Sequence, residues 1–321
     1  MKDYSEEIKQ YLKFFGMKRI FKNFLLIGIA AAMFTACGKD SDENELEDDG
    51  ADGVAVPIEN GAIKAKFTIS SAGDQAYFST GNLQYQASTK TWRFAENQYD
   101  VIGADNQFIS STYGGWIDLF CYGTSGWPSG AIAYQPYSTS VTESDYYIDG
   151  RVFFPRVKGY ENMDWGLYNK ISNGGNEAGV WRTLTGGEWI FLMEDRPNAK
   201  EKMGVANVNG VNGVVILPDD WTLPKGLKFT SGFSNESYAK VNKYSLEDWR
   251  KMEAHGAVFL PASGLRKGTQ VKDVGDGGYY WTSTVSYKKA QKAFFYSYGL
   301  DPCYEAACGT GYSVRLVQDV K

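Results

Sequence analysis

The chain has 321 residues, of which 43% are hydrophobic and 15% aromatic, and this composition excludes an intrinsically disordered protein. The formal net charge of −5 argues against a nucleic-acid-binding protein, because such proteins need clustered Lys and Arg. The single histidine argues against a multi-histidine metal site and against a histidine-based catalytic triad.

The first predicted element is a secretory signal peptide at 17–36. Its basic start, 17–22, precedes an uncharged apolar run of 13 residues, which is too short to span a bilayer. The run ends in Phe-Thr-Ala and is followed by Cys37, and this pattern resembles the lipobox of bacterial lipoproteins. The resemblance implies cleavage before Cys37 and lipidation of its thiol. The alternative is an ordinary cleaved signal with an incidental cysteine.

Two further segments flank the signal peptide. Residues 1–16 carry mixed charge and fit no targeting pattern, so we expect an over-long gene start and a true start at Met17. Residues 37–52 contain eight acidic residues and one lysine, which predicts an extended, self-repelling tether. The Lys-Asp-Ser-Asp-Glu run after Cys37 is also similar to the export signal of Bacteroidota surface lipoproteins. It implies a lipid anchor in the outer membrane, facing the cell exterior.

The remaining residues, 53–321, show no linker, low-complexity run or repeat, and we expect them to form one domain. Alternating or apolar runs bounded by turn residues predict many short strands. Long loops rich in Gly, Ser, Tyr and Asn are expected between 102 and 180. The predicted strands are 62–69, 76–79, 82–86, 91–95, 214–217, 257–260, 279–284, 293–298 and 312–317.

Two helices are predicted from their capping residues. Thr185 followed three residues later by Glu188 is a capping box, in which each side chain satisfies a backbone N–H of the first turn. The second helix is predicted to begin after Ser245 and to end at Gly256, a common residue after a helix C-terminus. His255 is expected only to terminate this helix. Few helices among many short strands predict an α+β fold.

Several stretches resemble a known family. The run WRTLTGGEW at 181–189 is similar to the RLPTEAEWEYA segment of formylglycine-generating-enzyme-like domains. The runs FLPASGLR at 259–266, GYYWTST at 278–284 and GYSVRLV at 311–317 resemble Bacteroidota surface lipoproteins related to the Fibrobacter succinogenes major paralogous domain. The resemblance implies a C-type-lectin-like fold with two helices, short twisted antiparallel sheets, long loops and neighbouring chain ends. Arg315 in the last of these runs is expected to be buried and paired with a carboxylate or with carbonyls.

The pair Cys303 and Cys308 has a spacing similar to that of the oxygen-activating cysteines of the formylglycine-generating enzymes. Three interpretations remain open: a local disulfide, which an oxidising envelope favours, free or metal-linked thiols, and a cysteine-dependent oxidase. Cys121 is then an odd, buried cysteine.

No cofactor and no metal are predicted. Calcium-dependent C-type lectins carry EPN or QPD and WND tripeptides, whereas Trp281-Thr282-Ser283 stands here where WND is expected. Asp273 and Asp276 are interpreted as turn residues rather than calcium ligands.

The sequence therefore predicts a non-catalytic, C-type-lectin-like module that binds a glycan or a cell-surface protein, contacts the membrane only through its lipid and binds no nucleic acid. Aromatic side chains that stack on sugars or anchor protein partners are the candidate ligand residues. They are Trp116, Trp127, Trp281 and Tyr304. The alternatives are a structural or fimbria-associated cell-surface subunit and the oxidase centred on Cys303 and Cys308.

Overall fold

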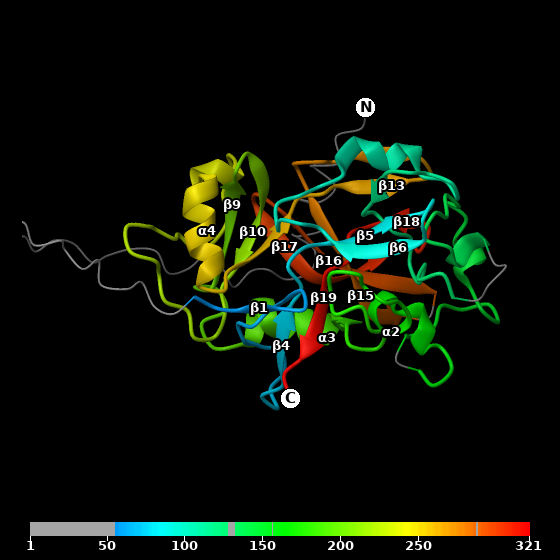
Figure 1. The fold of residues 1–321 in the computed structure, drawn as a ribbon, viewed down its shortest axis with the longest axis horizontal. Coiled ribbons are helices and arrows are strands. Elements are labelled where there is room, and N and C mark those ends of the chain that lie inside the picture. The colour runs from blue at the N-terminus through cyan, green and yellow to red at the C-terminus, as the bar shows by residue number, and fades with distance from the viewer. Residues whose placement is uncertain (1–54, 128–131, 156, 287) are drawn as a thin grey trace, which may run out of the picture. The chain divides into compact units, whose positions relative to one another are not determined.

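The computed structural model describes residues 55–127, 132–155, 157–286 and 288–321, which belong to one compact unit, Gly50–Lys321. Few short helices accompany many short strands in several small, mostly antiparallel sheets (Figure 1). The predicted α+β class is confirmed. The predictions for 1–16, 17–36 and 37–52, with Cys37, lie outside the described residues.

The strands of the described residues are arranged in six small sheets, in which only β11 and β9 pair in parallel. With the strands of each sheet in spatial order, the first three sheets are β1 (Ile58–Glu59) with β2 (Ala62–Ile63); β3 (Phe67–Thr68), β4 (Gln75–Phe78), β19 (Leu316–Asp319) and β8 (Arg182–Thr183); and β6 (Thr91–Phe94), β5 (Leu83–Gln86) and β7 (Trp116–Ile117). The next two sheets are β11 (Lys243–Tyr244), β9 (Met203–Val208), β10 (Val211–Ile216) and β12 (Val258–Pro261); and β14 (Gln270–Lys272), β13 (Leu265–Lys267) and β18 (Thr310–Gly311). The sixth sheet, which we call the central sheet, is β15 (Gly278–Ser286), β16 (Lys289–Tyr296) and β17 (Gly299–Ala306).

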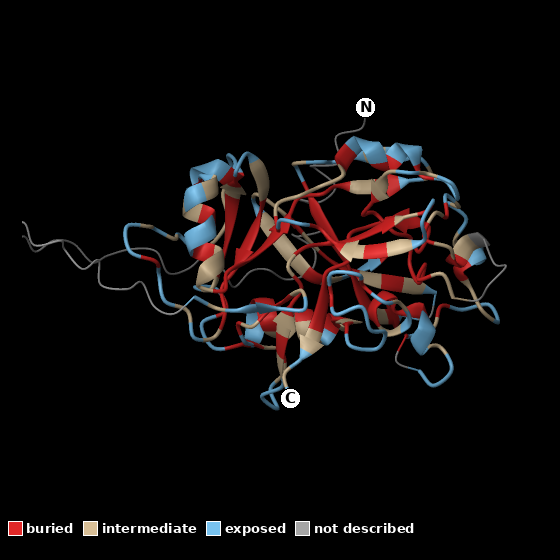
Figure 2. Cartoon of the chain, in the orientation of Figure 1, coloured by how far each residue is buried: buried red, intermediate tan, exposed pale blue. Residues whose placement is uncertain are grey.

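The sheet of β15, β16 and β17 separates two hydrophobic cores. Successive side chains of a strand point to opposite faces of its sheet. On β15, Tyr280 therefore packs in one core, together with Trp189, whereas Trp281 packs in another core with Phe120 and Trp165 of the long loop region and its one-turn helix. Strands are mainly buried and the connecting loops mainly exposed, as Figure 2 shows. The long loop region is thus attached to one face of this sheet and a helix to the other.

The C-terminal strand β19 lies between β4 and β8, so the two ends of the domain share a sheet. The predicted strand 312–317 becomes regular only at Leu316, because Tyr312 and Ser313 form single bridges to Phe120 and Tyr280 instead. The predicted strand 62–69 is likewise divided into β2 and β3.

Both predicted helices and both helix starts are confirmed. The helix α3 (Gly186–Ile190) begins with the Thr185–Glu188 capping box and continues as a π-helical turn, Phe191–Asp195. The helix α4 (Leu246–Ala254) has a second capping box, and it packs on β9, β10 and β12. His255 terminates α4, and Gly256 follows with a φ of +86°. A Cβ at Gly256 would also collide with Ala65, so both the backbone conformation and the lack of space require glycine at this position.

Gln98 connects three segments inside the protein. Its side chain is fully buried and accepts from the Phe259 N–H at 2.8 Å and from Arg315 Nη2 at 2.7 Å. Its amide donates to Glu253 Oε1 at 2.9 Å and to the Ala257 carbonyl at 3.0 Å. Arg315 was expected to pair with a carboxylate or with carbonyl groups, and the structure shows the second arrangement. Its guanidinium donates to Gln98 Oε1 and to the Phe259 carbonyl oxygen. Burial without a carboxylate contact lowers the pKa of Arg315 to about 10.

We expect the substitution Gln98→Leu to lower the free energy of unfolding by about 2–4 kcal/mol, because it leaves a buried N–H and a buried guanidinium without their acceptor. Urea unfolding measures this loss. The matched control is Gln86→Leu, whose side chain forms its hydrogen bonds at the surface and should cost less than about 0.5 kcal/mol. Equal effects of the two substitutions would contradict the role assigned to Gln98.

Candidate functional site

A pocket of about 430 Å³ combines aromatic rings with polar groups, and we call it the aromatic pocket. Its volume is in the usual range for small-ligand sites. Its lining comes from the β5–β6 hairpin, from the loop between β7 and α2, and from the end of α2 (Trp165–Tyr168). The lining residues are Tyr85, Lys90, Trp92, Ser125, Gly126, Gln135, Pro136, Tyr137, Tyr168 and Asn169.

The inner wall of the aromatic pocket is formed by the β5–β6 hairpin. Tyr85 and Trp92 are partners in the antiparallel register, and their ring centroids lie 4.5 Å apart. Both residues are almost completely buried, and the ring of Trp92 packs on Phe120, 5.4 Å away. Burial and the neighbouring Tyr137 raise the pKa of Tyr85, so its hydroxyl stays protonated at neutral pH. Tyr85 and Trp92 therefore contribute well-packed, uncharged rings to this wall.

The outer wall depends on a one-turn helix that the sequence analysis missed. Asp164 caps α2 by accepting from the N–H groups of Gly166 and Leu167. This places Tyr168, which is 41% exposed, at the rim of the pocket. Asn169 then donates to the Ser125 carbonyl at 2.8 Å and to the Trp165 carbonyl at 3.1 Å. Because both amide hydrogens are used, the Asn169 side chain has a fixed orientation.

Arg266 holds both ends of the loop that supplies half of the lining. Its buried guanidinium donates to the Leu119 carbonyl at 3.1 and 3.2 Å and to the Ser138 carbonyl at 3.1 Å. The pocket residues Ser125, Gly126 and Gln135 lie between these two anchors. The described residues next to these two anchors are thus held in place although they form little regular structure.

The lining determines what chemistry the aromatic pocket supports. It contains no Asp, Glu, His or Cys, and its one charged residue is Lys90. Hydrolysis of a glycosidic bond requires two carboxyl groups, and a calcium site requires several oxygen ligands, chiefly carboxylates. The lining supplies neither set. Aromatic faces with amide and hydroxyl groups are suited to reversible binding.

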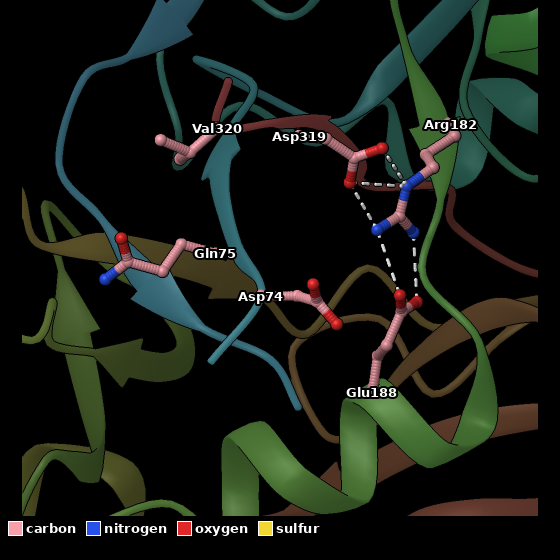
Figure 3. A pocket seen from close by; sticks show the side chains of 6 residues that line it. All are labelled: Asp74, Gln75, Arg182, Glu188, Asp319 and Val320. Atoms are coloured by element: carbon pink, nitrogen blue, oxygen red, sulfur yellow. Dashed lines mark hydrogen bonds and ion pairs between the residues drawn. The ribbon is translucent and has the colours of Figure 1, made fainter. Parts of the chain in front are cut away.

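A second, smaller pocket of about 290 Å³ is a structural ion-pair site (Figure 3). Arg182 donates to both oxygens of Glu188 at 2.9 Å and to both oxygens of Asp319 at 2.8 and 3.0 Å. Glu188 also accepts from the Thr185 N–H at 2.7 Å, which confirms its predicted capping role. The carboxylates raise the pKa of Arg182, although burial opposes them. Both carboxylates are therefore occupied in joining β8, β19 and α3.

The structure separates the four aromatic candidates predicted from the sequence. Trp116 is half-buried below the guanidinium of Arg93, 3.9 Å from its ring centroid, and does not line the aromatic pocket. Trp127 follows the pocket residue Gly126 and packs edge-to-face on Tyr134 and Tyr160. Neither side chain lines the aromatic pocket. Trp127 follows a lining residue in the chain, and Trp116 lies on β7, which pairs with the lining strand β5.

Trp281 and Tyr304 lie on the central sheet, outside the aromatic pocket. Trp281 is fully buried, and its indole N–H donates to the Phe120 carbonyl at 2.6 Å. The structure corrects the candidate ligand role of Trp281, because a core side chain without exposed surface cannot stack on a ligand. Tyr304 is 42% exposed and packs edge-to-face against Phe294, with 5.7 Å between ring centroids.

Lys292 lies beneath Tyr304 among three aromatic rings. Its Nζ is 5.0, 4.9 and 5.5 Å from the ring centroids of Phe294, Tyr304 and Tyr312. Burial lowers the pKa of Lys292 to about 8, and the charge of Asp301 opposes this only in part. The ring faces partly replace the water that the ammonium group loses.

Of the three interpretations left open for Cys303 and Cys308, the local disulfide is not present in this structure, where both thiols and that of Cys121 are free. Cys303 lies within β17, which remains extended through Ala306, and Cys308 follows the end of this strand and is buried. Cys303 donates to Gln291 Oε1 at 2.9 Å, while burial raises the pKa of Cys308 to about 12. The two thiols are not brought together, so the geometry gives no support to the oxidase hypothesis.

The other titratable residues considered from the sequence have local contacts. Asp273 has a φ of +58° in a turn and accepts from the Tyr279 hydroxyl at 3.0 Å. Burial raises the pKa of Asp276, with the charge of Asp273 adding to it. His255 Nδ1 lies 3.0 Å from the Thr222 carbonyl oxygen. Within the described residues, no group of three or more His, Cys, Asp or Glu side chains is placed to hold a metal ion.

The chain matches no protein-family model, no curated protein and no solved structure. Across the part of the chain that the structure describes, none of the helices has the length and apolar character needed to cross a membrane.

Sequence analysis missed the pocket residues because they come from distant segments. Tyr85 and Trp92 were placed on strands, but only the register shows that they are neighbours. Tyr137, Tyr168 and Asn169 lie in the stretch 102–180 that was predicted as long loops, where no motif marks them. One signal was available: Asp164 precedes Trp165 as a helix cap, and it marks the one-turn helix that presents Tyr168.

We expect Lys292→Met to change how stability depends on pH. The folded-state pKa is near 8 and the unfolded value near 10.5, so the unfolded chain binds more protons between these values. The stability of the natural protein should therefore rise by about 2 kcal/mol from pH 7.5 to 9.5 relative to the variant. Urea unfolding at both pH values measures the difference. Lys272→Met, at an exposed lysine, should leave the pH dependence unchanged, and an unchanged slope in Lys292→Met would refute the assigned pKa.

Proposed function

We propose that the protein is a non-catalytic glycan-binding module with a C-type-lectin-like fold, carried by a lipid-anchored lipoprotein on the outer face of the outer membrane. The observation that carries the proposal is the aromatic pocket, in which the more accessible rings of Tyr137 and Tyr168 and the fixed amide of Asn169 lie beside the buried rings of Tyr85 and Trp92. Aromatic rings stack on the apolar faces of sugars, and amides hydrogen-bond their hydroxyl groups. The lipid anchor at Cys37 and the location rest on the sequence patterns alone.

Three features support the C-type-lectin-like part of the proposal. Besides the one-turn helix α2, the domain has two longer capped helices, α3 and α4, among small, mostly antiparallel sheets. Long loops with little regular structure fill much of the chain between β6 and β8. Strand β4, from the N-terminal part of the domain, pairs with the C-terminal strand β19, as neighbouring chain ends require.

Binding without catalysis follows from where the reactive groups lie. The aromatic pocket is lined by no acid, histidine or cysteine. The carboxylates of Glu188 and Asp319 are held by Arg182, and the thiols of Cys303 and Cys308 are apart. A sugar seated in the aromatic pocket would therefore not meet the pair of carboxyl groups that hydrolysis of a glycosidic bond requires.

A glycan array probed with the purified protein, with and without EDTA, tests the proposal. We expect specific binding that EDTA does not reduce, because the pocket lining offers no carboxylate to a calcium ion. Binding that EDTA abolishes would show that the site is a different one. The absence of any glycan hit would overturn the proposal and favour a protein ligand or a structural, fimbria-associated role.

Two tyrosines of equal exposure distinguish the aromatic pocket from the rest of the surface. Tyr168 is 41% exposed at the pocket rim and Tyr304 is 42% exposed on the central sheet. We expect Tyr168→Ala to weaken binding of an array-identified glycan at least tenfold, since it removes a stacking surface, with little change in Tm. Titration calorimetry measures the affinities. Tyr304→Ala should leave the affinity unchanged, and the reverse pattern would locate the site on β17.

A further inference from the structure

Lys90 supplies the single charge of the aromatic pocket. It ends the four-residue turn 87–90 between β5 and β6, and its side chain is exposed. No residue that the structure describes forms an ion pair with it. Since no carboxylate lines the pocket either, nothing within it competes for the ammonium group of Lys90.

The backbone of Lys90 is an unfavourable place for a lysine. Its φ is +55°, in the left-handed region that residues with a Cβ rarely adopt. Every other described residue with positive φ is Gly, Asn or Asp, the three residue types that suit this conformation. The N–H of Lys90 donates to the Ala87 carbonyl at 3.3 Å, so the turn imposes the conformation whatever the side chain. The turn alone therefore does not explain a lysine at position 90, and strained residues of this kind gather at functional sites.

We propose that the aromatic pocket binds an acidic glycan, in which a sugar carboxylate pairs with the Lys90 ammonium while the sugar ring lies against the pocket's aromatic side chains. This inference rests on the proposed glycan-binding function and names the ligand class. An ammonium group is a point charge on a flexible stem, so it accepts a carboxylate from a range of directions. The uncharged remainder of the lining holds the sugar ring, and Lys90 selects the charged form.

An array of paired oligosaccharides tests the ligand class. Each pair contains an acidic glycan, such as an oligogalacturonate, and its neutral methyl ester, with unmodified neutral oligosaccharides beside them. We expect the acidic member of at least one pair to bind fivefold or more tightly than its ester. The preference should shrink as salt rises from 50 to 300 mM, because salt screens an exposed ion pair.

The variant Lys90→Asn separates the charge from the fold. Asn suits the left-handed conformation, so we expect the variant to unfold at a Tm about 2–4 °C higher than the natural protein. It should bind the acidic and esterified members equally. Lys66→Asn, at an exposed lysine outside the pocket, should keep the preference for the acidic member.

Each remaining outcome counts against the inference in a distinct way. Equal binding of both members by the natural protein, or a preference that survives in Lys90→Asn, would overturn the acidic ligand and leave the glycan-binding function intact. Binding of neutral oligosaccharides alone would do the same. If no glycan of any kind binds, the proposed function and the inference fail together.

Discussion

The burial of both faces of β15 is the constraint on which the rest of this structure depends. Tyr280 and Trp281 are adjacent, yet each is fully buried in a different hydrophobic core. The indole N–H of Trp281 holds the Phe120 carbonyl, and the ring of Phe120 supports Trp92 at the inner wall of the aromatic pocket. The pocket is thus connected to the centre of the domain through one hydrogen bond and one ring contact. Trp281 shapes the pocket without lining it.

Buried polar side chains give the loops their fixed shape. Arg266 and Arg315 are almost fully buried, and their guanidinium groups meet carbonyl oxygens instead of carboxylates. Arg266 joins the two ends of a pocket loop, and Gln98 joins Arg315 to β12 and α4. Such groups are costly to leave unpaired, so each specifies one arrangement of the segments around it. Long loops can therefore present a defined binding surface.

Local signals in the sequence predicted local structure well. Both capping boxes and the glycine after α4 need only residues within one or two turns, and all are present. Ten of the 19 described strands overlap a run predicted from alternation or apolar character, whereas the strands β9 and β17 lie where no strand was predicted. The signal at Trp281 was insufficient, because period-two alternation identifies a strand but not which of its faces is covered. That distinction separates Trp281 from the half-buried Trp116, and only the packing of distant segments decides it.

The same reasoning explains the misjudged cysteines and the missed pocket. A spacing of five residues fits a closed loop as well as an extended strand, and the pairing of β17 with β16 selected the strand. The aromatic pocket needs the β5–β6 register, the Arg266 contacts and the Asp164 cap together. The conformation of Lys90 depends on the turn that the hairpin register imposes. None of these can be deduced from one segment.

The central claim is that ligand binds in the aromatic pocket and that the central sheet only supports it. Titration of the protein with an array-identified glycan, followed by the indole N–H signals in a ¹H–¹⁵N NMR spectrum, tests this claim most directly. The account predicts that the Trp92 signal, assigned by a Trp92→Phe variant, shifts with ligand while the Trp116 signal stays in place. A shift confined to Trp116, with Trp92 unmoved, would contradict it.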